Sequence, residues 1–258
     1  MIRRLLLAAT ATLALGLAVL PAPTASAAAL TDAQKDEVRA LVKEFLLKNP
    51  EVIEEAMTEL ENKRSREQAE ARAKAVGEQS GVLFNSTRQG EFGNPKGDVV
   101  VVEFFDYNCG FCKRAAPDMA AVLGADSGVR YVTKEFPVLG AGSVEAAKVS
   151  IAVKLVAPDK HFEFHKKLLQ VRGEANKAKA MEVAADLGVD ADKLDKALAS
   201  PEVAATIEEV YAIANGLGLS GTPTYVIGQD VIPGAIGIDK LKEKIAEARK
   251  CGPDGKKC

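Results

Sequence analysis

The feature that most constrains the fold is a buried-strand pattern that leads directly into a pair of cysteines. Residues 98–105 read DVVVVEFF, a continuous β-branched and aromatic run of the kind found in strands that are covered on both faces. The sequence CGFC follows at residues 109–112, and a helical pattern from Lys113 to Leu123 begins directly after it. The first cysteine is therefore predicted to lie at the N-terminus of a helix, at the end of a central strand of an α/β fold.

That position gives the two cysteines different chemistry. Free N–H groups and the helix dipole favour a thiolate at Cys109, lowering its pKa from about 8.5 into the range of roughly 3.5–7.5. Cys112 lies one turn into the helix, where it can resolve a mixed disulfide formed by Cys109. A C-x-x-C pair also serves as half a zinc site, but the other two cysteines are spaced C-x6-C and do not complete one. The pair predicts thiol–disulfide exchange with no metal and no cofactor.

Two further features support that chemistry. Glu103 lies inside the apolar strand, where burial would raise its pKa and allow it to take the proton of Cys112. The alternative is that Glu103 faces solvent at the end of the strand. Thr222-Pro223 directly precedes a second strand pattern, and a cis X–Pro bond there would place backbone groups beside the sulfurs. Alone this signal is weak, because ordinary loop prolines are far commoner.

The other cysteines and the two histidines are interpreted as structural. Cys251 and Cys258 flank a Gly-Pro-Asp-Gly turn, and a structural disulfide is expected between them, with a second redox pair as the alternative. His161 and His165 are four residues apart and would share a helix face. The phenylalanines between them indicate ordinary packing rather than a two-histidine metal site, so no metal ligands are expected.

The first 27 residues have the parts of a secretory signal peptide. Arg3 and Arg4 precede an apolar run from Leu5 to Leu20, and the small-residue triplet Ala25-Ser26-Ala27 follows. The run is shorter than the roughly 20 residues that cross a bilayer, and no cysteine follows it to carry a lipid anchor. We expect cleavage after Ala27 and a soluble mature protein in the bacterial periplasm.

Residues 28–78 are predicted to form a helical segment that drives self-association. Thr31 and Gln34 form a capping box, and Asn49-Pro50 ends one helix and starts the next, with Asn49 as its N-cap. Apolar residues recur at helical spacing in both helices: Val38, Leu41, Val42, Phe45, Leu46, Val52, Ile53, Ala56, Met57 and Leu60. Two amphipathic helices cannot bury such stripes alone, so they must pack on the main domain or on another copy.

Residues 79–258 are predicted to form the main domain. A polar linker, roughly residues 78–97, leads into it and admits a short strand at Val82-Leu83-Phe84. The later elements are a strand at 129–136, a helical region at about 140–217, a hairpin at 224–232, a helix at 239–250 and a tail at 250–258. Breaks in the helical region are expected at Pro158, Gly173, Gly188 and Pro201. This order fits a thioredoxin-like sheet with a helical domain inserted halfway.

The charge balance excludes one class of partner. The chain has 34 basic and 36 acidic residues, a formal net charge of −2. Nucleic-acid binding usually requires a strongly basic face. No nucleic-acid partner is therefore expected.

Three segments together resemble the DsbA-like thioredoxin-fold oxidoreductases: FFDYNCGFCKRAAP, KEFPVLGAGSVEAA and GTPTYVIGQDVIPGAIG, within residues 83–249. The segment LTDAQKDEVRALVKEFLLKNPEVIEEAM resembles the oligomerisation region of the branch called suppressor of copper sensitivity protein C, or ScsC. The resemblance implies Cys109 as nucleophile, Cys112 as resolving thiol, Glu103 as buried acid and Thr222-Pro223 as the cis-proline pair. Gly110-Phe111, which tunes the redox potential, replaces the Pro-His of DsbA. The strong oxidising power of DsbA is therefore not carried over.

We expect a periplasmic disulfide isomerase that acts on cysteine-containing exported proteins and exchanges electrons with a membrane-bound redox partner. Isomerase is preferred because the N-terminal helices predict a homo-oligomer, and the ScsC resemblance favours a trimer. One alternative is a dithiol oxidase of DsbA type. Another is a copper-tolerance protein that binds Cu(I) through the same two thiolates. A glutathione-transferase-like relative would not need Cys112.

Overall fold

The computed structural model describes residues 30–251. This part of the chain divides into two compact units between Thr58 and Glu59, and each is described by itself. No helix within residues 30–251 is long and apolar enough to span a lipid bilayer. The expected signal peptide and the expected partner of Cys251 lie outside the described residues.

The N-terminal unit consists of helix α1 (Asp32–Lys48) and the start of helix α2 (Glu51–Asn85). The predicted capping box is confirmed, because Thr31 and Gln34 exchange both of its hydrogen bonds. The expectation that Asn49 caps the second helix is wrong. Its side-chain amide instead donates to the carbonyl oxygen of Phe45 at the end of α1. No residue of α1 is buried.

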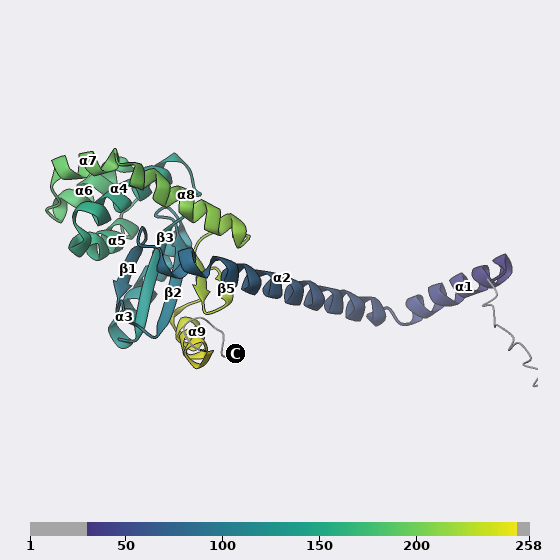
Figure 1. Cartoon of the computed structure of the whole chain (residues 1–258). Coiled ribbons are helices and arrows are strands. Elements are labelled where there is room, and N and C mark those ends of the chain that lie inside the picture. The colour runs from purple at the N-terminus through teal and green to yellow at the C-terminus, as the bar shows by residue number, and fades with distance from the viewer. Residues whose placement is uncertain (1–29, 252–258) are drawn as a thin grey trace, which may run out of the picture. The chain divides into compact units, whose positions relative to one another are not determined.

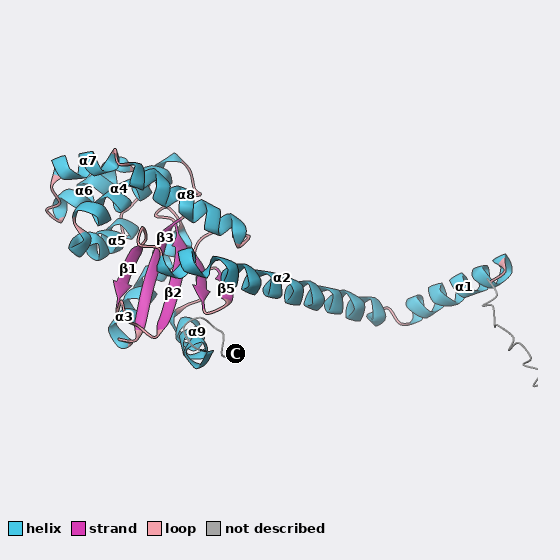
Figure 2. Ribbon diagram, in the orientation of Figure 1, coloured by secondary structure: helices cyan, strands magenta, loops and turns pink. Residues whose placement is uncertain are grey.

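The second unit is built on a five-stranded sheet of order β1-β3-β2-β4-β5 (Figure 2). The strands are β1 (Gly90–Gly93), β2 (Val99–Phe105), β3 (Val129–Glu135), β4 (Thr224–Ile227) and β5 (Asp230–Pro233). The central pair β2 and β3 is parallel, and the other three pairs are antiparallel. All seven residues of β2 are buried, as its unbroken apolar pattern predicts.

Alternate residues of the strands contact different helices, as the two-residue period of a strand requires. One face packs on α3 (Gly110–Ala125) and α9 (Ile238–Cys251), with Val101 of β2 among the contacts. The other face, which carries Val102, packs on α8 (Pro201–Gly216) and on the C-terminal end of α2. Glu103 shares the strand parity of Val101, so it points to the face covered by α3 and α9.

A helical domain lies between β3 and β4 in the sequence, as predicted (Figure 1). Its elements are α4 (Ala141–Val156), the 3-10 turn η1 (Pro158–Lys160), α5 (His161–Leu169), α6 (Lys177–Asp186), α7 (Ala191–Leu198) and α8 (Pro201–Gly216). Pro158 and Pro201 start η1 and α8, and Gly173 and Gly188 lie in the connections on either side of α6, so these predicted breaks are confirmed. The core of this domain is continuous with Phe105, Tyr107, Cys109 and Cys112.

The short strand admitted at Val82-Leu83-Phe84 is wrong, because these residues form the last turns of α2. Val76, Leu83 and Phe84 are buried against the sheet face that also packs on α8. Their spacing of seven and eight residues matches one helix face. Three consecutive apolar residues fit the two-residue period of a strand and the 3.6-residue period of a helix equally well. Only the burial of Val76 on the same face distinguishes the helix.

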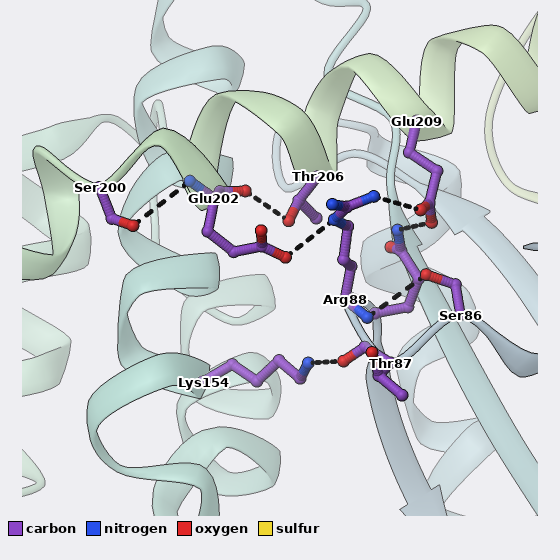
Figure 3. Close-up of polar contacts among 9 residues, drawn as sticks. Ser86, Thr87, Arg88, Lys154, Ser200, Glu202, Thr206 and Glu209 are labelled. Carbon is purple, nitrogen blue, oxygen red and sulfur yellow. Dashed lines mark hydrogen bonds and ion pairs between the residues drawn. The ribbon is translucent and has the colours of Figure 1, made fainter.

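The segment after α2 is bonded to the helical domain (Figure 3). Arg88 donates to Glu202 at 2.8 Å and to Glu209 at 3.2 Å, both on α8. Lys154 of α4 donates to the carbonyl oxygen of Thr87. Ser200 caps α8 by accepting from the Glu202 amide. These contacts hold residues 86–89 in place between the end of α2 and the start of β1.

Candidate active site

The loop between β2 and α3 is held by one buried carboxylate. Asp106, 1% exposed, accepts hydrogen bonds from the amides of Val138 and Leu139 and from the hydroxyl of Ser143, at 2.7–3.0 Å. It also accepts from the amide of Asn108 at 2.7 Å, and its own carbonyl accepts from the Cys109 amide at 3.1 Å. The position of Cys109 is thereby tied to the loop that follows β3.

Cys109 is the N-cap of α3, as the sequence predicts. Its sulfur accepts a hydrogen bond from the Cys112 amide at 3.4 Å and lies 3.1 Å from the carbonyl oxygen of Thr222. Hydrogen bonds, chiefly from the Cys112 side chain and then from the Thr222 side chain and the backbone amides of Cys112 and Phe111, lower the pKa of Cys109 to about 5. Burial acts in the opposite direction. The residue is 5% exposed, so a client has to reach a largely covered sulfur.

Cys112 lies on the first turn of α3 and is 1% exposed. Its pKa is raised, first by its hydrogen bond to Cys109, then by burial and by the charge of Glu103. Both cysteines are free thiols in this structure. The two thiols are thus opposite in character: Cys109 is a thiolate at neutral pH, whereas Cys112 needs a base before it can react.

The low pKa of Cys109 predicts the pH dependence of its alkylation. Only the thiolate reacts, so the rate with iodoacetamide should rise with a midpoint near pH 5 and change little above pH 7. The rate is measured by mass spectrometry of the reduced protein between pH 3 and pH 9. A midpoint near the unperturbed value of about 8.5 would contradict the prediction. Cys112→Ala is the control. Its midpoint should be higher, because the variant lacks the side-chain hydrogen bond that contributes most to the low pKa of Cys109.

The two residues between the cysteines are exposed. Phe111 is 57% exposed, and the Arg114 guanidinium carbon lies 4.3 Å from the centre of its ring. The Gly110-Phe111 pair thus presents an aromatic surface directly beside the reactive sulfur. Neither residue supplies an imidazole to the Cys109 thiolate.

Glu103 is buried in β2, which rules out the solvent-facing alternative. One carboxylate oxygen accepts a hydrogen bond from the Tyr131 hydroxyl at 2.7 Å. Burial raises the pKa of Glu103 to about 7, and the charges of Cys109 and Asp118 act in the same direction, whereas the Tyr131 hydrogen bond lowers it. A carboxyl group with this pKa exchanges protons readily near neutral pH.

The Thr222–Pro223 peptide bond is cis and precedes β4. The hydroxyl of Thr224 donates to the carbonyl oxygen of Gly221 at 2.8 Å, closing the turn that carries this pair. The structure therefore brings together five of the residues singled out in the sequence: Glu103, Cys109, Cys112, Thr222 and Pro223.

His161 and His165 are buried and bonded within the protein. His161 contacts the hydroxyl of Ser150 at 3.1 Å, and His165 contacts that of Tyr107 at 3.1 Å. Burial lowers the pKa of each to about 3, so both are neutral. Within residues 30–251 there is no group of three or more His, Cys, Asp or Glu side chains arranged to hold a metal ion. The disulfide expected between Cys251 and Cys258 lies partly outside the described residues.

Two residues of the site were not found from the sequence. Asp106 follows a strand and starts an Asp-Tyr-Asn turn, a composition that indicates a turn but not four accepted hydrogen bonds. Tyr131 alternates with Arg130 and Val132 in β3, and its hydroxyl on the buried face needs a polar partner. Parallel pairing of β2 and β3 places that partner, Glu103, within reach.

The chain is similar to several solved structures. A thioredoxin-like oxidoreductase from Silicibacter pomeroyi DSS-3 is 38% identical, covering 66% of this chain and 97% of that one, with a TM-score of 0.63. Proteus mirabilis ScsC in a transitional conformation is 29% identical over 87% of this chain and 99% of that one, with a TM-score of 0.64. The thiol-disulfide exchange protein α-DsbA2 from Wolbachia pipientis is 26% identical over 69% of this chain and 96% of that one, with a TM-score of 0.66.

The curated relatives share only part of their length with this chain. The Na⁺/H⁺ antiporter NhaA 1 of Salinispora arenicola is 27% identical over 150 residues, which are 58% of this chain but 23% of the antiporter. The Copper resistance protein ScsC N-terminal domain matches residues 34–68. The DSBA-like thioredoxin domain matches residues 100–246, more than half of the chain. With its cysteine pair at the start of α3 and its N-terminal match, the chain belongs to the DSBA-like thioredoxin family of thiol–disulfide oxidoreductases, with an ScsC-type N-terminal segment.

Proposed function

We propose that the protein is a disulfide isomerase for exported proteins, with Cys109 as nucleophile and Cys112 as resolving thiol. The observation that carries the proposal is the opposite character of the two thiols. Cys109 caps α3 with a lowered pKa, and Cys112 beside it is buried with a raised one. A dithiol of this kind attacks a client disulfide with one sulfur and is released by the other.

The cycle has two routes, of which the first needs no external reagent and the second needs a reductant to restore the protein dithiol. The Cys109 thiolate attacks one sulfur of a client disulfide, and the other client sulfur leaves as a thiolate. That thiolate can attack another disulfide of the client, and a client thiolate then attacks the mixed disulfide, so that a rearranged client disulfide forms and Cys109 leaves as a thiolate. Alternatively Cys112 attacks Cys109, the client leaves reduced, and the protein is left with a Cys109–Cys112 disulfide. Glu103 takes the proton of Cys112 in this second route.

Clients are proposed to bind beside the sulfur of Cys109. Phe111, Val138 and Leu139 are apolar and 42–57% exposed. Val138 and Leu139 are tied through Asp106 to the loop that precedes Cys109. Unfolded proteins expose apolar side chains, so a surface of this kind favours misfolded clients over folded ones. The carbonyl of Thr222, beside the sulfur, is available to align the client backbone.

The isomerase direction requires that the dithiol be kept reduced. A membrane-bound redox partner is proposed to supply the electrons, and the periplasm is the proposed location because residues 1–27 have the composition of a signal peptide. The absence of an imidazole between the cysteines supports a weaker oxidant than DsbA. The exposed apolar stripe of α1 supports self-association, in which several reduced sites act on one client.

A copper-binding role is the second candidate. It is favoured by the match of residues 34–68 to the N-terminal domain described as belonging to a copper resistance protein. Cu(I) is soft and prefers thiolate ligands, and Cys109 and Cys112 are adjacent free thiols. This role needs both sulfurs reduced and gives no catalytic turnover.

Reactivation of a ribonuclease with scrambled disulfides tests the proposal. The reduced full-length mature chain should restore activity catalytically, and the double variant Cys109→Ser/Cys112→Ser should not. Oxidation of reduced ribonuclease by the oxidised chain, without reactivation of the scrambled form, would assign a DsbA-type oxidase instead. Failure in both assays, combined with Cu(I) binding tighter than that of the double variant, would favour the copper role.

A further inference from the structure

The buried carboxyl of Glu103 has a single close hydrogen-bond partner among the described residues. The hydroxyl of Tyr131 donates to its Oε2 atom at 2.7 Å, and Tyr131 is 1% exposed. The arrangement follows from strand pairing. Glu103 is opposite Thr133 in the parallel pair β2–β3, so Tyr131, two residues earlier, projects to the same face.

We propose that Tyr131 is a positioning residue for thiol–disulfide exchange, whose phenol holds the Glu103 carboxylate in its charged form so that it can take the proton of Cys112. This proposal rests on the proposed function. Tyr131 does not touch the reacting sulfurs in the proposed cycle. It acts through Glu103, by setting the pH at which that base is available.

The charged groups that face Glu103 oppose its ionisation. On β4, Tyr225 is directly opposite Glu103 in the antiparallel pair, and α3 contributes Asp118 and both cysteines. From α9 the packed side chains are apolar: Leu241, Ile245 and Ala248. Burial, the Cys109 thiolate and Asp118 all raise the pKa of Glu103, and the Tyr131 hydrogen bond lowers it to the value of about 7. Tyr131 itself has a pKa raised by burial, so it remains a neutral donor.

The proton transfer that this arrangement serves is a complete step. Cys112 gives its proton to the Glu103 carboxylate, and the resulting thiolate attacks Cys109 in the mixed disulfide. A bond forms between the two protein sulfurs, and the bond from Cys109 to the client breaks. The client leaves as a thiolate and takes up a proton, while the protonated Glu103 returns its proton to solvent. Two electrons pass from the protein dithiol to the client disulfide.

Tyr131→Phe removes the hydrogen bond and keeps the ring. A hydrogen bond to a charged group contributes about tenfold or more to the ionisation equilibrium. The pKa of Glu103 should therefore rise by at least about one, and its ionised fraction at pH 7 should fall from about one half to about one tenth. We expect single-turnover release of the second peptide thiol, the one held in the mixed disulfide with Cys109, to slow about fivefold at pH 7 and to recover by pH 9. Attack by Cys109 adds no pH dependence in this range, because its pKa is about 5.

Tyr225→Phe is the matched control. It removes a hydroxyl from a second buried tyrosine beside Glu103, and no hydrogen bond from Tyr225 to Glu103 is present within residues 30–251. Its pH profile should match that of the unaltered protein. In a Glu103→Gln background, Tyr131→Phe should have no further effect on the rate, since the group on which it acts is gone.

Titration of the Glu103 carboxyl by ¹³C NMR in the reduced protein gives a readout that does not depend on activity. Tyr131→Phe should move the titration to higher pH. Replacement of Tyr131 alone by 3-fluorotyrosine, whose more acidic phenol is a stronger donor, should move it to lower pH and covers the case in which the Phe variant does not fold. A rate loss that is equal at every pH, or an unmoved titration, overturns the proposal. A protein without exchange activity but with these shifts would refute the proposed function alone.

Discussion

Cys112→Ser is expected to convert the protein into a covalent trap that accumulates as mixed disulfides with its clients. Cys109 can still attack, because the serine hydroxyl can take over the hydrogen bond from the Cys112 side chain that contributes most to its low pKa. The serine cannot resolve the adduct, since its hydroxyl is far less acidic than a thiol. Turnover by the resolving route should fall at least about 100-fold, which is about 2.7 kcal/mol of barrier.

Trapping is measured by expressing the variant of the whole chain from Met1 in bacteria, quenching with acid and separating the adducts on a non-reducing gel before mass spectrometry. Cys109→Ser is the matched control and should trap few clients, because the remaining thiol is 1% exposed and has a raised pKa. Cys112→Ala should also trap clients, but more slowly at low pH. Equal trapping by the two serine variants would show that the assignment of nucleophile and resolving thiol is wrong.

The fold class was predictable because its signals lie in consecutive residues. The apolar run of β2, the C-x-x-C at the next helix start and the hairpin at Thr224 each carry their own pattern, and the α/β fold with a helical insert is confirmed. The end of α2 was not predictable from Val82-Leu83-Phe84. Those residues become helical because they complete a face with Val76 that packs against the sheet, and a tertiary contact of this kind has no local signature.

The candidate site shows the same division. Cys109 and Cys112 can be identified as site residues from their C-x-x-C spacing, and Glu103 from its position as a charged residue inside an apolar strand. Tyr131 is an ordinary strand residue until the register of β2 and β3 is known, because only that register brings its hydroxyl to Glu103. The role of Asp106 likewise depends on a distant segment, because its carboxylate accepts hydrogen bonds from backbone amides of the loop after β3. Contacts between residues on different segments cannot be predicted from the residue pattern of either segment alone.

The mature chain is expected to self-associate through its N-terminal helices, and removal of residues 28–75 is expected to give a monomer that retains thiol exchange. Nine apolar side chains of this segment are 46–72% exposed: Leu30, Val38, Leu41, Val42, Phe45, Leu47, Ile53, Met57 and Leu60. Burying a large side chain fully contributes roughly 1.5–3 kcal/mol. Covering the exposed half of each contributes on the order of 1 kcal/mol, so a symmetric interface could be stable at micromolar concentrations.

The structure fixes where the truncation must end. Val76, Leu83 and Phe84 are part of the sheet core, so a deletion that continues past Ala75 would open that core. The shortened chain should reduce a small disulfide peptide at a rate within about twofold of the full chain, because Cys109 and Glu103 keep their surroundings. Reactivation of scrambled ribonuclease should fall at least about tenfold, because one site no longer has a second site beside it to act on the same client.

A full-length variant separates loss of association from loss of residues. Leu41→Glu combined with Phe45→Glu places two charges on the exposed stripe of α1, where each would have to lose its hydration in an interface. This variant should behave as the truncated chain does, whereas substitution of the charged Lys43 by Glu serves as the control for charge alone. Light scattering of the unaltered mature chain measures its mass in solution and so tests whether it self-associates. We expect a trimer. A monomer at tens of micromolar, or a monomeric variant with full isomerase activity, would remove self-association as the basis for preferring isomerase over oxidase.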